Sequence, residues 1–479
     1  MGPFATTRAS HGALCDHSPQ PRDVSGCDPR AGGAAGGPRA GNLGTMPAVQ
    51  SRFVVRMFST FVLFSVLAGQ FWRSVGGWWG FGLIAAIVVV GSITLLVTQK
   101  PALNWRRFPK TLVAFMLLAT LSIAWSAYPA AAALGVTLQW ITTIAAVFLA
   151  LTLTWAELLR TLSSALRWVL GLSIVFELFV AAVIQAPVLP FFVDYGDEKI
   201  PQAFYWSRAL LLTGGPIEGI VASRNLLGFV ALLAVIVFGL QLAAKTVRRG
   251  WGVAWLTFAV VMLGLTRSAT ITLATLVVLV VLGFALWTRR AHPQHRRPIY
   301  ATAAALLVAS VSALLFFSGP LLGLFGKSED LTGRFDIWNS VIDLASERPV
   351  IGWGWVSYWN PFVEPFANLA ERKGVVYLQA HNAWLDVWLQ LGIVGVIVFG
   401  LLALSTLWRA WFLAVDRPRL GVADTTPYAA SALLPLLVTA ALLAQSVAES
   451  RLLVEYGWVL LVVMAVMTKR HQGAPTKMP

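Results

Sequence analysis

The chain has 479 residues, of which 57% are hydrophobic and only 12% charged, and it carries a formal net charge of +15. A soluble domain has about 25% charged residues, so this chain cannot cover a water-exposed surface. The composition therefore excludes a soluble globular protein and predicts an all-α, polytopic helical membrane protein. The positive charge does not require a nucleic-acid partner, because the basic residues occur as pairs between apolar runs, as in loops that fix membrane orientation.

Residues 1–45 form a low-complexity segment that is rich in Gly, Pro, Ala and Arg. Such a segment cannot bury enough apolar surface to order itself. We expect either a disordered cytoplasmic tail or a start codon assigned too far upstream. Both cysteines, Cys15 and Cys27, lie in this segment, so the membrane region is expected to have no disulfide and no cysteine metal site.

Apolar stretches of spanning length follow along the rest of the chain. A membrane-spanning helix needs ~20 mostly apolar residues. Twelve stretches meet this requirement, near residues 53–71, 78–98, 109–127, 130–153, 166–187, 222–243, 251–267, 269–287, 299–322, 383–408, 429–448 and 453–468. We therefore expect nine transmembrane helices within 46–318, a large loop at 319–382, three more helices within 383–468 and a cytoplasmic tail at 469–479.

The loops between these stretches differ in charge. One alternating set holds nineteen Lys and Arg residues, whereas the opposite short loops hold six. Because basic loops stay in the cytoplasm, both termini are predicted to be cytoplasmic, and the loops around 188–221 and 319–382 are predicted to lie on the outer face. The large loop is rich in tryptophan, and Phe335, Trp338, Ile342 and Ala345 recur at helical spacing. A folded helical cap on the outer face is therefore expected.

Four polar residues fall on the outer side of this topology: Arg224, Arg267, Arg334 and His381. An isolated outer arginine often contacts lipid headgroups. Three of them on the side that the charge rule depletes suggest a ligand instead. The guanidinium group can bind phosphate oxygens through two hydrogen bonds at once, so a diphosphate beside the membrane is a suitable ligand.

His381 is the only one of the six histidines that is expected on the outer face. A neutral imidazole can accept a proton from a hydroxyl group, which suggests group transfer beside the diphosphate. The alternative is an interfacial histidine next to a helix start that Asn382 caps. Glu449 and Arg451, between the last two spans, are expected either to pair with each other or to line the outer cavity.

The carboxylates Asp194, Asp197 and Glu198 form a short acidic run in the outer loop. They are expected either to be solvated or to bind a divalent cation, and we assign no metal site to them. The chain contains no Gly-rich phosphate loop, HExxH or CxxC motif, and no cofactor is expected.

Several motifs resemble the O-antigen ligase and O-antigen polymerase superfamily of bacterial integral membrane glycosyltransferases. They are Ser223-Arg-Asn225, Thr266-Arg-Ser268, Gly333-Arg-Phe-Asp-Ile-Trp338, Arg348-Pro-Val-Ile-Gly-Trp-Gly354, His381-Asn382 and Leu391-Gly-Ile-Val-Gly395. Their order and spacing carry the resemblance, which is sharpest in residues 220–400. Gln390 is a departure, since many relatives have Glu there.

The resemblance implies a metal-independent, inverting transfer of a glycan from a polyprenyl-diphosphate carrier, with no cofactor. Arg224 and Arg267, together with Arg334, would hold the diphosphate, and His381 would act as the general base on an acceptor hydroxyl. Asn382, Glu449 and Arg451 would support the site. The partners would be the lipid-linked donor, membrane lipids and a glycan, lipid or protein acceptor, at the outer face of the cytoplasmic membrane.

Three functions stay open at this point. A ligase passes a finished glycan to a different acceptor, whereas a polymerase passes it to another repeat unit, and the late position of the large loop favours a ligase. A transporter or flippase for lipid-linked glycans is the third. Transporters usually have internal repeats, and we find no convincing repeat in this sequence.

Overall fold

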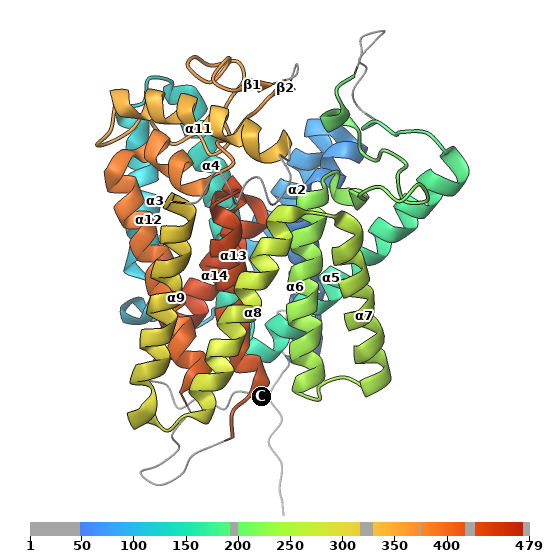
Figure 1. Cartoon of the computed structure of the whole chain (residues 1–479), viewed down its shortest axis with the longest axis vertical. Helices are drawn as coiled ribbons and strands as arrows, with labels where there is room; N and C mark the ends of the chain where they lie inside the picture. Colours follow the sequence, from blue (N-terminus) through green and yellow to red (C-terminus); the bar gives the residue numbers. More distant parts are fainter. Residues whose placement is uncertain (1–47, 192–199, 317–328, 373–374, 417–426, 473–479) are drawn as a thin grey trace, which may run out of the picture. The chain divides into compact units, whose positions relative to one another are not determined.

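The computed structural model describes residues 48–191, 200–316, 329–372, 375–416 and 427–472. Almost all of this chain is helical (Figure 1). The helices are α1 (Ala48–Leu67), α2 (Gly69–Gln99), α3 (Lys110–Leu121), α4 (Pro129–Thr152), α5 (Trp155–Phe179), α6 (Arg224–Ala243), α7 (Arg249–Thr266), α8 (Ala269–Arg290), α9 (Arg297–Phe316), α11 (Glu329–Glu347), α12 (Ala383–Val415), α13 (Leu434–Ser446) and α14 (Glu455–His471). The short strands β1 (Glu371–Arg372) and β2 (Val375–Val376) pair antiparallel.

Seven helices of the described chain are long and apolar enough to cross a bilayer: α2, α4, α5 with its π-helical extension to Ile184, α6, α7, α8 and α12. The predicted all-α, polytopic membrane fold is therefore confirmed. The described residues of the other predicted stretches are also mostly helical. The apolar helices around α3 and α13 are shorter, at Lys110–Ala124 and Ala430–Ser446. The count of twelve crossings stays a prediction.

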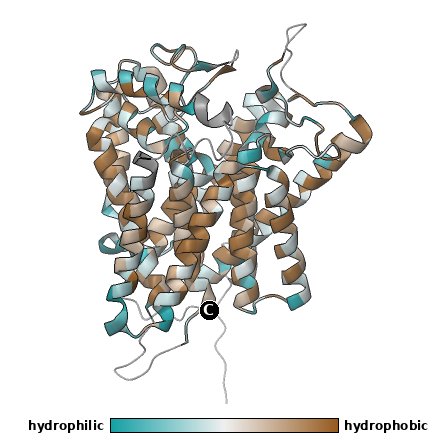
Figure 2. Ribbon diagram, in the orientation of Figure 1, coloured by the Kyte–Doolittle hydropathy of each residue, from teal (hydrophilic) through white to brown (hydrophobic). Residues whose placement is uncertain are grey.

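Hydrophobic residues predominate along the helices, and hydrophilic residues are more frequent toward both ends of the bundle (Figure 2). Several side chains on α2, α7 and α8 are strongly exposed although they are apolar, for example Trp79, Val260 and Leu273. Such an exposed apolar surface is unfavourable in water and favourable in lipid. It is the surface expected of helices that face hydrocarbon.

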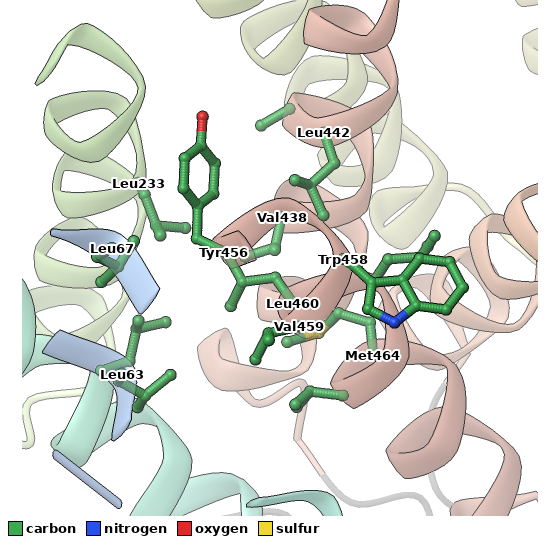
Figure 3. Close-up of a cluster of buried hydrophobic side chains, with 14 of the residues drawn as sticks. Leu63, Leu67, Leu233, Val438, Leu442, Tyr456, Trp458, Val459, Leu460 and Met464 are labelled. Carbon is green, nitrogen blue, oxygen red and sulfur yellow. The ribbon is translucent and has the colours of Figure 1, made fainter. Parts of the chain in front are cut away.

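Helix α14 lies at the centre of the bundle. All of its residues from 456 to 468 are buried. Figure 3 shows Tyr456, Trp458, Val459, Leu460 and Met464 of α14 among Leu63 and Leu67 of α1, Leu233 of α6, and Val438 and Leu442 of α13. The indole of Trp458 donates a hydrogen bond to Thr143 of α4 (2.8 Å). The segment that precedes α14 is thereby held in one place, and this segment carries Glu449.

The two ends of the bundle differ. Figure 1 shows α11 and the β1–β2 pair at one end, and the connections from α6 to α7 and from α8 to α9 at the other. Those two connections and the adjoining helix ends carry seven of the nineteen basic residues of the loop set predicted to be cytoplasmic: Lys245, Arg248, Arg249, Arg289, Arg290, Arg296 and Arg297. The large loop and the basic turns therefore lie at opposite ends, as the charge pattern predicts.

Helix α11 packs on a second, smaller apolar core, which it shares with the loop that follows it and with α4 and α12. Ile337, Val341 and Ala345 are buried in this core together with Trp359 and Phe366. The predicted helix is present. Of the four residues at helical spacing, Ala345 is buried, but Phe335 and Ile342 are 42% and 38% exposed. Two neighbouring apolar stripes run along this helix, and periodicity alone does not tell which of them faces the core.

Helix α12 breaks at Gly392, which has φ 65° and ψ −168°. Residues 349–354, here called the clamp segment, fill this break. They pair with α12 through four backbone hydrogen bonds: Trp353 N–H to Leu389 O (3.0 Å), Gly354 N–H to Gln390 O (2.8 Å), Ile393 N–H to Pro349 O (2.9 Å) and Val394 N–H to Val350 O (3.3 Å). Backbone groups freed inside a membrane protein need protein partners. The clamp segment therefore fixes the loop between α11 and α12, which is part of the predicted outer loop, to α12.

The loop that precedes α6 is tied to α5 by a buried glutamate. Glu177 is 1% exposed and accepts hydrogen bonds from the backbone N–H groups of Glu218 (3.0 Å) and Gly219 (2.7 Å) and from the hydroxyl of Ser207 (2.9 Å). Glu218 in turn pairs with Arg208. These contacts fix the approach of the chain to the N-terminus of α6.

Candidate functional site

Glu449 lies at the centre of a polar cluster, in the connection between α13 and the 3-10 turn Ser450–Leu453. Its side chain is only 5% exposed. Oε1 accepts hydrogen bonds from Asn225 Nδ2 (2.8 Å) and Arg334 Nη2 (2.9 Å), and Oε2 lies 2.9 Å from His381 Nδ1. The carboxylate therefore joins the start of α6, helix α11 and the entry to α12, which are far apart in the sequence.

His381 is the last residue before the N-cap of α12. Its φ of 51° lies in the left-handed region, which few residues other than glycine adopt. Contacts on both sides hold it there. The Asn382 side chain caps α12 by accepting the backbone N–H of Trp384 (3.0 Å), and Asp386 accepts the backbone N–H of Ala380 (3.0 Å). The predicted cap is thus present, and it positions the residue that precedes it.

The loop around His381 has further anchors. The carboxylate of Asp386 also accepts a short hydrogen bond from the Ser450 hydroxyl, so it links the His381 loop to the Glu449 loop. Trp338 of α11 donates its indole N–H to the carbonyl of Ala380 (3.0 Å). The ring of Tyr377 lies edge-on to the imidazole, with 5.4 Å between the ring centroids. The position of His381 is therefore set by several elements.

Arg334 points from α11 into the same cluster. Its Nη1 donates to the hydroxyl of Thr270 on α8 (3.2 Å), and its Nη2 donates to Glu449. The side chain is 12% exposed. The structure thus brings three of the sequence-predicted residues together, Arg334, His381 and Glu449.

Arg224 and Arg267 are linked to the cluster through their neighbours. Ser268 follows Arg267 and donates its hydroxyl hydrogen to the side-chain oxygen of Asn225 (2.7 Å), which follows Arg224. Arg224 is the first residue of α6, and Arg267 ends α7 with φ 47°. The side chain of Arg267 is exposed and its Nη2 approaches Gly214 in the loop between α5 and α6. Both turns are therefore fixed relative to Glu449, with a cationic side chain on each.

Arg451 takes part in a second polar group next to the first. Its Nη1 donates to Glu455 Oε2 (2.8 Å) and, through a short hydrogen bond, to the hydroxyl of Tyr358. Arg73 of α2 approaches the other oxygen of Glu455 (3.9 Å). Of the two arrangements expected for Arg451, a direct pair with Glu449 is therefore wrong, because Arg451 pairs with Glu455 instead.

The charges around Glu449 determine its ionisation. Burial opposes the charged form, but His381, Arg334 and Arg451 outweigh this effect and lower the pKa of the carboxyl group from 4.5 to about 2. Burial also opposes the charge on Arg451, yet Tyr358 and Glu455 more than offset it and raise the pKa of the guanidinium. Glu449 is therefore ionised at neutral pH.

Sequence reasoning missed several members of these groups: Asn225, Ser268, Thr270, Tyr358 and Glu455. Asn225 and Ser268 stand inside motifs that carried the resemblance, directly after the two arginines. Their position next to the two arginines was the feature of the sequence that could have identified them. Nothing in the sequence indicates that Tyr358, from the outer loop, contacts Arg451.

The acidic run Asp194, Asp197 and Glu198 lies outside the described residues. In the part of the chain that the structure does describe, no group of three or more His, Cys, Asp or Glu residues has the geometry of a metal site. Both expectations for the acidic run, solvated carboxylates or a bound divalent cation, stay predictions.

The fold and the cluster define a class: a multi-pass helical membrane protein with a buried Glu–His–Arg cluster at the end where its large loop lies. Residues 252–400 match the family model described as O-antigen ligase. This region includes Arg267, Arg334 and His381. It confirms the resemblance to the O-antigen ligase superfamily that the motifs indicated.

One curated protein is similar to part of this chain. The chain is 28% identical over 198 residues to the "Exopolysaccharide production protein ExoQ" of Rhizobium meliloti (strain 1021). The similar region covers 38% of this chain and 43% of that relative, so the match spans less than half of either protein. The two comparisons therefore show similarity over part of the chain, and the family match covers the region that carries most of the family motifs.

Proposed function

We propose that this protein is an O-antigen ligase-like glycosyltransferase, which moves a glycan from a polyprenyl-diphosphate carrier to an acceptor hydroxyl. The observation that carries this proposal is the cluster around Glu449. It sets a histidine beside Arg334 and ties it to the two turns that bear Arg224 and Arg267. A base next to several cations suits the transfer of a group from a diphosphate to a hydroxyl.

In this proposal, His381 removes the proton from the acceptor hydroxyl as its oxygen bonds to the anomeric carbon of the donor sugar. The bond from that carbon to the diphosphate breaks, and the diphosphate leaves with the electron pair. Arg224 and Arg267 stabilise the leaving group, because cations placed where charge develops lower the barrier. Arg334 adds to this positive field from α11. Attack from the face opposite the leaving group makes the transfer inverting.

We place the reaction at the outer face of the cytoplasmic membrane, with both termini in the cytoplasm. Support comes from the basic turns, which lie at the end opposite to α11. The outer loop would cover the site and keep out water, which would otherwise hydrolyse the donor. The proposed reaction needs no metal and no cofactor, since the histidine and the arginines supply the base and the positive charge.

A repeat-unit polymerase is the second candidate, because the chemistry is the same and only the acceptor differs. The name of the ExoQ relative refers to exopolysaccharide production. A polymerase would extend a chain of repeat units, whereas a ligase would attach one glycan to a lipid or protein. The length of the product separates the two.

The test uses the purified full chain with a polyprenyl-diphosphate glycan and candidate acceptors in EDTA. Transfer to an acceptor supports the proposal, with a single addition indicating a ligase and a ladder of repeats indicating a polymerase. The same protein in vesicles tests the transporter alternative. Movement of the lipid-linked glycan between leaflets without any transfer would overturn the proposal in favour of a flippase.

A further inference from the structure

We propose that Glu449 is the positioning residue of His381, an inference that rests on the transferase function proposed above. Glu449 holds the imidazole in the tautomer that carries its proton on Nδ1, and thereby leaves Nε2 to accept the proton of the acceptor hydroxyl. The ion pair between Arg334 and Glu449 is part of the same arrangement, because it keeps the carboxylate in place.

The tautomer follows from the hydrogen bond. His381 Nδ1 lies 2.9 Å from Glu449 Oε2. An ionised carboxylate can only accept hydrogen bonds, so the ring nitrogen must be the donor. In a neutral imidazole with a proton on Nδ1, the other nitrogen carries the lone pair. The basic nitrogen is then the one that points away from Glu449.

The partners of Glu449 keep the carboxylate ionised and aligned. Its Oε1 accepts hydrogen bonds from Asn225 and Arg334, so Oε2 is left for His381. The carboxylate is almost fully buried, and a buried charge persists only where it is paired and hydrogen-bonded. When His381 takes up a proton during transfer, the adjacent negative charge stabilises the imidazolium, as the acid does in a Ser-His-Asp triad.

The backbone on both sides restricts the pair further. His381 follows a loop that Trp338 and Asp386 hold, and Asp386 also binds Ser450, the residue after Glu449. The histidine and the glutamate thus belong to two loops that one buried carboxylate links. This arrangement fixes the distance between the two side chains before any substrate binds.

The central test is a double-mutant cycle on the transfer reaction of the full chain. Glu449→Gln is expected to lower kcat about 10²–10⁴-fold with little change in KM for the donor, because the amide no longer enforces the tautomer. Adding His381→Ala to Glu449→Gln is expected to cost much less than His381→Ala costs alone, since the two residues act as one unit. Independent, multiplicative losses would overturn the inference.

Glu218→Gln is the matched control. Glu218 is also a buried glutamate with an arginine partner, Arg208 (2.5 Å), but it belongs to the loop before α6. Its replacement is expected to lower thermal stability and to leave kcat within a few-fold of the wild type. A kcat loss equal to that of Glu449→Gln would show a merely structural effect and would contradict the proposal.

If Glu449→Gln does not fold, Glu449→Asp replaces it in the cycle. The loss of kcat caused by His381→Ala is again expected to be smaller in this variant than in the wild type.

A second readout does not need activity. Nitrogen-15 NMR of histidine-labelled protein, with His381→Ala to assign the signal, is expected to show the proton on Nδ1. A proton on Nε2 would overturn the inference. If the wild type transfers nothing, the proposed function fails, and the NMR result still decides the role of Glu449.

Discussion

A Cβ atom on Gly352 would lie 2.5 Å from the carbonyl carbon of Gln390, across the break in α12. Gly352 also has φ +67°, which side chains other than glycine rarely allow. Gly392 is in the same situation on the other side, where a Cβ atom would overlap the carbonyl group of Val350. The two glycines therefore permit the close backbone contact that fastens the outer loop to α12.

We expect Gly352→Ala to destabilise the protein strongly, because the methyl group overlaps backbone atoms that cannot move independently. Thermal unfolding in detergent should show a large drop in Tm or no folded protein at all. Gly283→Ala is the control, since a Cβ atom there meets nothing within 4 Å, and alanine is favoured over glycine in a helix by about 0.5–1 kcal/mol. Equal behaviour of the two variants would contradict the role of the clamp segment.

Arg334→Ala is expected to cost about 3–5 kcal/mol of stability, the usual effect of removing one partner of a buried ion pair. The two side chains of the pair are 12% and 5% exposed. Asp416→Ala is the comparison, because Asp416 is 51% exposed in its pair with Arg296 and such pairs contribute about 0.2–1 kcal/mol. Denaturation of both variants in the same detergent measures the difference. If Arg334→Ala lowers the free energy of unfolding no more than Asp416→Ala does, the result would be inconsistent with a buried pair.

Asn382→Ala is expected to lower stability by about 1 kcal/mol through loss of the N-cap of α12, while Asn382→Ser should retain most of it. Transfer assays should show a smaller loss of kcat than for His381→Ala, since Asn382 acts on the histidine only by holding its backbone. The contradicting result is a loss of kcat in Asn382→Ser that is as large as the loss in His381→Ala. That result would indicate direct contact of Asn382 with the substrate.

The low pKa of Glu449 predicts a pH-dependent contribution to stability. The pKa of the carboxyl group is about 2 in the folded state, below the ordinary 4.5, so its charge stabilises the fold fully above pH 4.5. This contribution is lost as the pH falls from 4.5 toward 2. The Tm difference between wild type and Glu449→Gln should therefore be largest near neutral pH and shrink in acid. A difference that does not change with pH would rule out an ionised Glu449.

Composition and hydropathy were sufficient to predict the membrane fold, because in the described part of the chain each predicted apolar stretch overlaps an α-helix. They could not fix the buried face of α11, where two apolar stripes compete, or the number of crossings. The glycine motifs around Gly352 and Gly392 were recognised as a family resemblance, but their role as a backbone contact depends on a long-range pairing that local patterns do not contain.

The candidate site could be predicted in part for a similar reason. Arg334 and His381 stood out because the predicted topology places few arginines and a single histidine on the outer side. The central position of Glu449 could not be inferred, since it depends on how three distant elements meet. The role of Gln390 could not be inferred either. Its side-chain oxygen accepts hydrogen bonds from the backbone N–H groups of Val356 (2.8 Å) and Ser357 (3.0 Å) and so holds the loop before α12.

The most direct test of the account compares wild type with His381→Ala in a transfer assay with polyprenyl-diphosphate glycan donor in EDTA. We predict product from the wild type and nearly complete loss in the variant, while both proteins remain folded in detergent at the assay temperature. Equal product from both would contradict the account, because His381 would then not be the base.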